Sequence, residues 1–236
     1  MKNKPLVAVV DWKKSPRGGE KCTVEKAAIG GSARVKYFKC DTEKDWKGEL
    51  LKADYILLWH NTVMPDTVIN KLEDCKAIIR IGTGYDSVDH VTAATRDIPV
   101  CNVPDYGTEE VADHSIALAL ALCRQIIPID RECKNLGWEI PNKNKIQRFG
   151  EMMFGVIGLG RIGTSVALKA KALGFEVHFY DPYLSNGVDK SLGISRNKDF
   201  NKFLSLMDVI SVNCPLTEET HHMITKKEIN KMRKNA

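Results

Sequence analysis

The sequence predicts an α/β protein with parallel sheets, and three observations lead to that prediction. Short apolar runs alternate with helical segments over residues 1–102, as in a parallel sheet with helices on both faces. Gly158, Gly160 and Gly163 stand between an apolar run and a helical repeat. The 236 residues, 43% of them hydrophobic and 28% charged, suit one large or two medium globular domains.

The first part of the chain reads as regular β and α units. The expected strands cover residues 6–10, 33–38, 53–58, 77–81 and 98–101. The expected helices cover residues 23–29, 65–72 and 88–95. This alternation predicts that residues 1–102 form one small α/β domain, and residues 103–236 a second one.

A change of pattern at residues 102–104 marks a candidate hinge. Thr108 is the expected N-cap of a long helix through about Ile127, which Pro128 should end or kink. The polar residues 135–150 read as a connecting loop. The apolar residues 116–123 are bounded by charged residues and are too few to span a membrane.

The stretch from Phe154 to Asp181 reads as strand, glycine turn, helix, strand and acid, the dinucleotide-binding pattern of a Rossmann fold. Gly158 permits the tight turn, Gly160 lets the backbone approach a pyrophosphate, and Gly163 lets the helix lie close to the strand. The helix N-terminus would face the phosphate charge.

Asp181 follows the second strand of that pattern and is placed to accept hydrogen bonds from ribose hydroxyls. Its carboxylate would repel a 2′-phosphate, so NAD is favoured over NADP. The alternative is a structural Rossmann turn that binds nothing.

Later segments predict about three strands after Phe154, including residues 208–213, a helix over 199–206 and a last helix over 226–234. A dinucleotide fold has six strands. The sequence therefore predicts an incomplete Rossmann unit, either standing alone or truncated. Truncation is favoured because a sheet that stopped there would leave an open edge.

Composition argues against several other functions. The net charge of +5 includes basic residues near Lys13 and in the last helix. These read as solvated faces, because no aromatic residues are interleaved for base stacking. The seven cysteines show no C-x-x-C spacing and no zinc pattern. They suggest a reduced, cytoplasmic protein without a metal site.

Four segments together give the chain its resemblance to a known family. They are RIGTGYD at residues 80–86, CNVPDYGTEEVADH at 101–114, GVIGLGRIG at 155–163 and YDPY at 180–183. They resemble the D-isomer-specific 2-hydroxyacid dehydrogenases, in the branch of phosphoglycerate dehydrogenases and C-terminal-binding-protein corepressors. The resemblance implies a flavodoxin-like N-terminal substrate domain, an NAD-binding Rossmann domain, and an active site in the cleft between them.

The resemblance also implies site residues and an assembly. Gly82, Thr83 and Gly84 match the turn whose amides hold the substrate carboxylate, for which the alternative is a plain strand-to-helix turn. The matching cofactor positions are Thr83, Thr108, Gly158, Gly160, Arg161, Ile162, Gly163, Asp181, Cys214, Pro215 and Thr220. In the family the helix over residues 108–127 builds a homodimer contact, whereas an intramolecular core helix is the alternative.

No catalytic residue can be assigned from the resemblance. The family uses an Arg, a Glu and a His that lie beyond the last residue of this sequence. His114, His221 and His222 match non-catalytic positions, and His60 receives no role. Three hypotheses follow: an NAD-dependent 2-hydroxyacid dehydrogenase acting on a small 2-hydroxy or 2-oxo acid, an NAD(H)-sensing corepressor-like peptide binder, or an inactive fragment.

Overall fold

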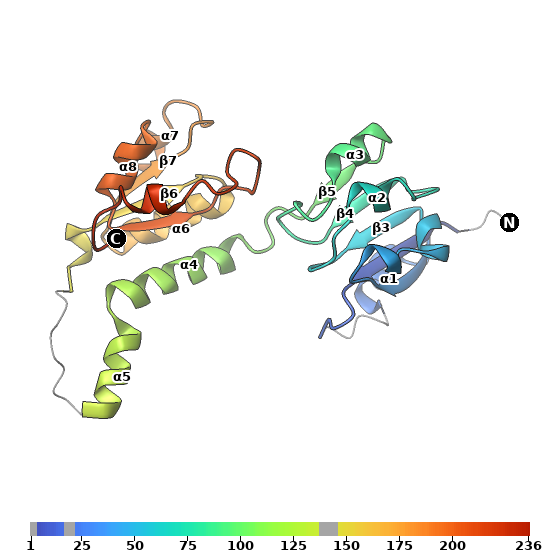
Figure 1. Cartoon of the computed structure of the whole chain (residues 1–236), viewed down its shortest axis with the longest axis horizontal. Helices are drawn as coiled ribbons and strands as arrows, with labels where there is room; N and C mark the ends of the chain where they lie inside the picture. The colour runs from blue at the N-terminus through green and yellow to red at the C-terminus, as the bar shows by residue number, and fades with distance from the viewer. Residues whose placement is uncertain (1–3, 17–21, 137–145) are drawn as a thin grey trace. The chain divides into compact units, whose positions relative to one another are not determined.

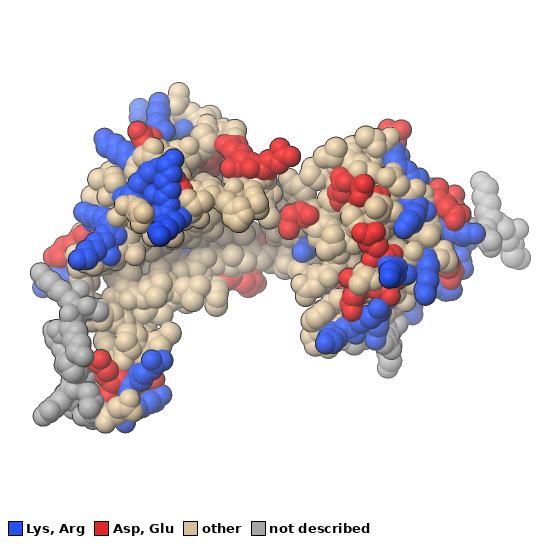
Figure 2. All heavy atoms as spheres, in the orientation of Figure 1, with Lys and Arg blue, Asp and Glu red and all other residues tan. Residues whose placement is uncertain are grey.

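The computed structural model in Figure 1 describes residues 4–16, 22–136 and 146–236. The chain divides into two compact units, Met1–Tyr106 and Gly107–Ala236. Each unit is built around its own parallel sheet. The face shown in Figure 2 carries both basic and acidic side chains on each unit.

The first unit contains a five-stranded parallel sheet in the order β2-β1-β3-β4-β5. The strands are β1 (Leu6–Asp11), β2 (Arg34–Lys39), β3 (Tyr55–Leu58), β4 (Ala77–Arg80) and β5 (Val100–Asn102). The helices are α1 (Thr23–Ile29), α2 (Asp66–Ile69) and α3 (His90–Thr95), with 3₁₀ turns at Glu43–Asp45 and Gly48–Lys52. This is the flavodoxin-like strand order, so the predicted α/β fold class is confirmed.

The core of the first unit lies on both faces of β1. All six residues of that strand are buried, and the strand is internal to the sheet, with β2 on one side and β3 on the other. The fully buried side chains of Ile56, Leu58 and Ile78 continue the core across the sheet. A strand buried on both faces reads as an unbroken apolar run, and for this reason it was visible in the sequence.

The second unit contains a four-stranded parallel sheet in the order β8-β7-β6-β9. The strands are β6 (Met153–Ile157), β7 (Glu176–Tyr180), β8 (Ser195–Arg196) and β9 (Val209–Val212). The helices after β6 are α6 (Arg161–Ala172), α7 (Val188–Leu192), α8 (Phe200–Leu206) and α9 (Lys226–Ile229), and the 3₁₀ turn Phe149–Glu151 precedes β6. The order matches 3-2-1-4 of a doubly wound dinucleotide fold.

The prediction of about three strands in this unit is wrong, because β8 is a fourth. With two residues, β8 is too short to produce an apolar alternation, and it is recognised only by its pairing with β7. The final helix is also shorter than predicted: α9 ends at Ile229 rather than near residue 234.

Close packing in the second unit depends on a glycine within β6. A methyl group added to Gly155 would lie 2.6 Å from both Phe203 Cζ and Met207 Cγ. The absence of a side chain therefore lets α8 and the residue after it lie directly against the central strand.

The predicted helix from Thr108 to about Ile127 is wrong in its extent. α4 spans Thr108–Cys123, and α5 spans Ile126–Leu136. The break lies at Gln125, whose φ of 52° is left-handed. The end or kink expected at Pro128 is found slightly earlier in the chain, since α4 and α5 meet at an angle of 51°. Pro128 itself lies in the first turn of α5, where an N–H group has no helical partner.

Two further details of the linking region differ from the sequence prediction. Gly107, not Thr108, is the N-cap of α4, and Thr108 is the first helical residue. The predicted loop over 135–150 begins within α5, and its residues 137–145 lie outside the described part of the chain. Among described residues, no single helix could cross a membrane; only the bent pair Thr108–Cys123 and Ile126–Asn135 passes that test of length and composition.

Candidate functional site

The glycine turn after β6 is shaped by two close approaches. Gly158 has a φ of 82°, and a methyl group there would lie 2.7 Å from the backbone nitrogen of Cys214. A methyl group at Gly163 would overlap the carbonyl oxygen of Gly158. Both positions therefore require glycine, the first because of the left-handed backbone and the second because α6 lies against the turn.

Gly160 differs from these two glycines because the space around it is open. No described atom outside its neighbours lies within 4 Å of an added methyl group. Gly160 is the N-cap of α6, and no side chain caps that helix end. The first-turn N–H groups and the positive end of a 12-residue helix thus face an open surface suited to an anion.

Asp181 lies beside this turn and is held by two backbone amides. Its Oδ2 accepts a hydrogen bond from the N–H of Leu159 at 2.9 Å, and its Oδ1 accepts one from Tyr183 at 3.0 Å. Leu159 lies between the first two glycines of the turn. The carboxylate is therefore oriented toward the mouth of the turn, where its remaining lone pairs can accept further hydrogen bonds.

The loop after β9 supplies the third side of the site. Cys214 lies against Gly158, so this loop borders the glycine turn. The Thr220 hydroxyl donates to the carbonyl of Pro215 at 2.6 Å and accepts from the N–H of Thr217 at 2.8 Å. The Thr220 side chain therefore stabilises the conformation of this loop through hydrogen bonds to the loop's own backbone.

Burial raises the pKa of the Cys214 thiol, and the negative charges of Asp181 and Glu219 raise it further. The thiol is thus kept protonated beside two carboxylates.

Of the other predicted cofactor residues, Arg161 is exposed at the start of α6, and Ile162 packs against the core. Ile162 can therefore contribute its backbone N–H but not its side chain.

The predicted substrate turn, Gly82–Gly84, follows β4 in the first unit. The Asn102 side-chain amide donates to the carbonyl of Thr83 at 2.8 Å, and the N–H of Val103 donates to that of Gly82 at 3.1 Å. These bonds fix the turn against the segment that follows β5.

Sequence reasoning missed two side chains at this turn, Arg80 and His60. Arg80 Nη1 donates to the carbonyl of Ile81 at 3.0 Å, and Arg80 Nη2 lies 3.2 Å from His60 Nδ1. A methyl group on Gly82 would overlap Arg80 Nη1, so the guanidinium covers that glycine. Within the described residues, the buried Arg80 Nε has no hydrogen-bond partner. In the sequence, the only indication of this role was the position of Arg80, two residues before the glycine turn.

The structure assembles the predicted residues into two groups, one in each unit. Thr83 belongs to the first unit. Thr108 belongs to the second, where its buried hydroxyl has no hydrogen-bond partner among described residues. His114, His221 and His222 are exposed. No cluster of three or more His, Cys, Asp or Glu residues in the described chain could hold a metal ion.

Comparison with known proteins agrees with this geometry. Residues 116–236, just over half of the chain, match the model of "D-isomer specific 2-hydroxyacid dehydrogenase, NAD binding domain". The chain belongs to the D-isomer-specific 2-hydroxyacid dehydrogenase family. The predicted resemblance is therefore confirmed, and the NAD prediction is confirmed by the domain that matches.

Two curated relatives and one solved structure illustrate the similarity. The chain is 35% identical over 195 residues to D-3-phosphoglycerate dehydrogenase of Methanocaldococcus jannaschii, covering 83% of this chain and 37% of the relative. It is 32% identical over 231 residues to C-terminal-binding protein 1 of Caenorhabditis elegans, covering 94% of this chain and 30% of the relative. The chain thus spans about a third of the length of these relatives.

The solved structure is D-lactate dehydrogenase from Aquifex aeolicus complexed with NAD and lactic acid. The TM-score is 0.83 at 27% sequence identity, and the match covers 96% of this chain and 66% of that one. Both the fold and the family are therefore shared with an enzyme that was crystallised with a dinucleotide.

Proposed function

We propose that this chain belongs to an NAD-dependent 2-hydroxyacid dehydrogenase, an oxidoreductase that transfers a hydride between NAD(H) and a small 2-hydroxy or 2-oxo acid. One observation supports this most directly: the open surface at Gly160 lies beside a carboxylate that is hydrogen-bonded to Leu159 of the same turn. That pairing suits a pyrophosphate next to an unphosphorylated ribose.

Each group of residues has a distinct role in this proposal. The amides of Gly160, Arg161 and Ile162 bind the pyrophosphate, and Asp181 accepts hydrogen bonds from the ribose hydroxyls. Cys214, Pro215 and Thr220 form or shape the loop on the adenosine side. NAD supplies the hydride chemistry when bound.

In the first unit, the turn Gly82–Gly84 would bind the substrate carboxylate through the amides of Thr83 and Gly84, with Arg80 adding a positive charge. The N–H of Gly82 already donates to the carbonyl of Arg80 at 2.9 Å. Thr83 and Thr108 would approach the nicotinamide end of the cofactor. We assign no general acid–base role to His114, His221 or His222, because in the described part none of them is hydrogen-bonded to a carboxylate. His178 does lie 3.0 Å from a carboxylate oxygen of Glu176, but both residues belong to strand β7, and we give this pair no catalytic role.

Titration of the full chain with NADH and NADPH, followed by nicotinamide fluorescence, tests the cofactor part of the proposal. We expect NADH to bind more tightly, because Asp181 repels a 2′-phosphate. Addition of glyoxylate or hydroxypyruvate then tests whether this chain oxidises NADH. Turnover would exclude the inactive-fragment hypothesis, and failure of both nucleotides to bind would contradict the cofactor assignment.

We further propose a homodimer in the cytoplasm, with α4 and α5 at the subunit contact. Leu118, Leu122, Ile126 and Ile127 are exposed on these helices, and Leu122 is 76% exposed. Apolar side chains in such a cluster are typical of an interface. Sedimentation should show a dimer that Leu122→Glu converts to a monomer, whereas a wild-type monomer would contradict the proposal.

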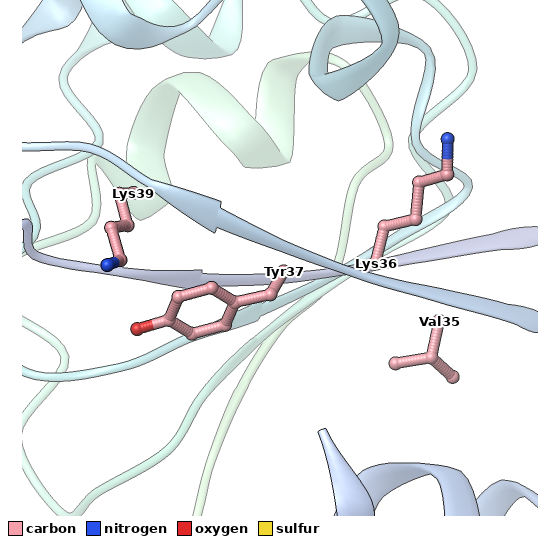
Figure 3. Close-up of a pocket in the computed structure, with 4 residues that line it drawn as sticks. All are labelled: Val35, Lys36, Tyr37 and Lys39. Carbon is pink, nitrogen blue, oxygen red and sulfur yellow. The ribbon is translucent and has the colours of Figure 1, made fainter. Parts of the chain in front are cut away.

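A second candidate function, peptide binding of the corepressor type, is favoured by the edge of the first sheet. Among the strands that the structure describes, β2 pairs only with β1, and it borders a groove lined by Val35, Lys36, Tyr37 and Lys39 (Figure 3). An extended peptide could add a strand there. Protection of β2 amides from hydrogen exchange by short peptides would support this function, and its absence at millimolar peptide would exclude it.

A further inference from the structure

A side-chain hydrogen bond joins two loops at the rim of the nucleotide site. The hydroxyl of Tyr183, which lies just after β7, donates to the carboxylate of Glu219 in the loop after β9. The two residues are 36 positions apart in the sequence. This contact is absent from the dinucleotide-binding pattern, which ends at Asp181.

Tyr183 contacts two carboxylates at once. Its backbone N–H donates to Asp181 Oδ1 at 3.0 Å while its hydroxyl holds Glu219. The following residues are fixed by Arg196, whose guanidinium donates to the carbonyl oxygens of Leu184 at 2.9 Å and Ser185 at 2.6 Å. The position of Glu219 is therefore tied, through Tyr183, to that of Asp181.

The charge of Glu219 reaches the glycine turn. Cys214 lies in contact with Gly158, and its thiol is acted on by the negative charges of both Asp181 and Glu219. Two carboxylates from different loops thus contact the same residue, Tyr183, beside the glycine turn. Arg161 at the start of α6 is the nearest cation in sequence to that turn, and no ion pair joins it to either acid among the described residues.

We propose that Glu219 is a second acidic determinant of nucleotide choice, and that Tyr183 is the residue that positions it. This inference rests on the proposed function of the site as an NAD site. A 2′-phosphate brings a charge of about −2 to the adenosine ribose, so a second carboxylate nearby adds to the repulsion from Asp181. The Glu219 side chain is exposed and that of Asp181 is half-buried, and solvent therefore limits the size of the effect.

The experiment measures Kd for NADH and NADPH with the full chain at low salt, for wild type, Glu219→Gln and Tyr183→Phe. We expect Glu219→Gln to tighten NADPH binding by roughly three- to tenfold, with NADH changed less than about twofold, as expected for one charge acting across partly solvated space. Tyr183→Phe leaves Glu219 charged but removes the hydrogen bond that holds it. We therefore expect this substitution to change the ratio of NADPH to NADH affinity in the same direction, by a smaller factor.

Glu218→Gln is the matched control, because it removes the same charge from the neighbouring exposed position of the same loop. It should leave the NADPH/NADH ratio unchanged. An equal shift in Glu218→Gln and Glu219→Gln would mean that net charge alone is responsible, and would overturn the proposal. Equal weakening of both nucleotides by Glu219→Gln would show a purely structural role and overturn it as well.

Failure of the proposed function gives a different result from failure of this inference. If wild type binds neither nucleotide, the NAD site itself is wrong. A different result would reject only the role of Glu219. In that case wild type prefers NADH and Asp181→Asn relaxes that preference, but Glu219→Gln does not. The NAD site would then stand.

Discussion

This chain has two glycine turns, Gly82–Gly84 after β4 and Gly158–Gly163 after β6. Both place glycines just after a parallel strand, but the charged side chains beside them have opposite sign. At the first turn, the guanidinium of the chain's own Arg80 covers the glycine. At the second turn, the space at Gly160 is open and a carboxylate lies at its rim. We propose that backbone amides bind an anion at both turns, and the neighbouring charge would then determine which anion fits.

This difference also separates glycines that the fold requires from a glycine that only the ligand requires. A methyl group at Gly158 or Gly163 would collide with backbone atoms of the same unit, whereas one at Gly160 would enter open space. Substitutions at these positions should therefore separate loss of stability from loss of binding.

The largest expected effect is that of Gly158→Ala on the stability of the second unit. A left-handed backbone costs an alanine about 1–2 kcal/mol, and overpacking against Cys214 adds about 1–3 kcal/mol. The free energy of unfolding of that unit should fall by the sum of these terms. Hydrogen exchange of the β6 amides in urea measures it.

The first unit provides the internal control for that experiment. Trp12, Trp46 and Trp59 all lie there, so tryptophan fluorescence largely follows its unfolding. We expect the fluorescence midpoint to be unchanged by Gly158→Ala. Equal destabilisation of both units would contradict the view that each sheet forms its own core.

Gly160→Val should instead lower nucleotide affinity strongly while costing only about 1 kcal/mol of stability, because valine is a poorer N-cap than glycine. The Cβ of the added side chain meets no described atom within 4 Å, and the side chain would occupy the surface where a pyrophosphate would approach the amides. Loss of even one hydrogen bond to a charged group costs about 1.5–3 kcal/mol, so Kd for NADH should rise at least roughly tenfold. Fluorescence titration beside urea unfolding checks both halves of the prediction, and unchanged NADH affinity would falsify the pyrophosphate assignment.

At the other turn, Arg80→Gln should weaken binding of small carboxylates and leave NADH affinity unchanged. Loss of a charged partner from a carboxylate contact predicts a roughly tenfold rise in Kd for glyoxylate. The adjacent Trp59 and His60 make tryptophan fluorescence a suitable probe. Arg34→Gln, on the exposed face of β2, is the matched control, and an equal effect of both substitutions would point to general electrostatics.

The sequence indicated most of this arrangement, for reasons that the structure makes clear. β1 and β6 lie in the interior of parallel sheets, so their apolar runs were unambiguous, and each glycine of the second turn stood next to a recognisable strand and helix. β8 was missed because its two residues are defined by pairing alone. The helix break was predicted from Pro128 but lies three residues earlier, at Gln125, because nothing local marks a left-handed glutamine.

Contacts between distant residues were beyond the reach of sequence reasoning. The guanidinium of Arg80 over Gly82 depends on a side-chain rotamer, and the bond between Tyr183 and Glu219 joins loops from two different strands. The role of Thr220 within its own loop depends likewise on hydroxyl geometry. Position in a motif predicts where such residues lie but not which atoms they contact.

The smallest expected effect is a difference in acid sensitivity between the two units. In the first unit, hydrogen bonds from Lys36 and Lys76 lower the pKa of Glu49 and Asp54 respectively, and the Thr92 backbone N–H lowers that of Asp89. In the second unit, the Thr225 hydroxyl lowers the pKa of Glu228 to about 2.

A carboxylate with a lowered folded-state pKa stabilises the fold above its unfolded pKa, near 4, and loses that contribution as pH falls through the folded value. Because more such groups are found in the first unit, its urea midpoint should fall further between pH 6 and pH 3 than that of the second unit. Tryptophan fluorescence and β6 hydrogen exchange report the two midpoints separately. Asp54→Asn should reduce the difference, since it removes a titrating partner of Lys76 and of the Leu6 N–H at the start of β1. A steeper fall in the second unit would mean that Glu228 outweighs the carboxylates with lowered pKa in the first unit.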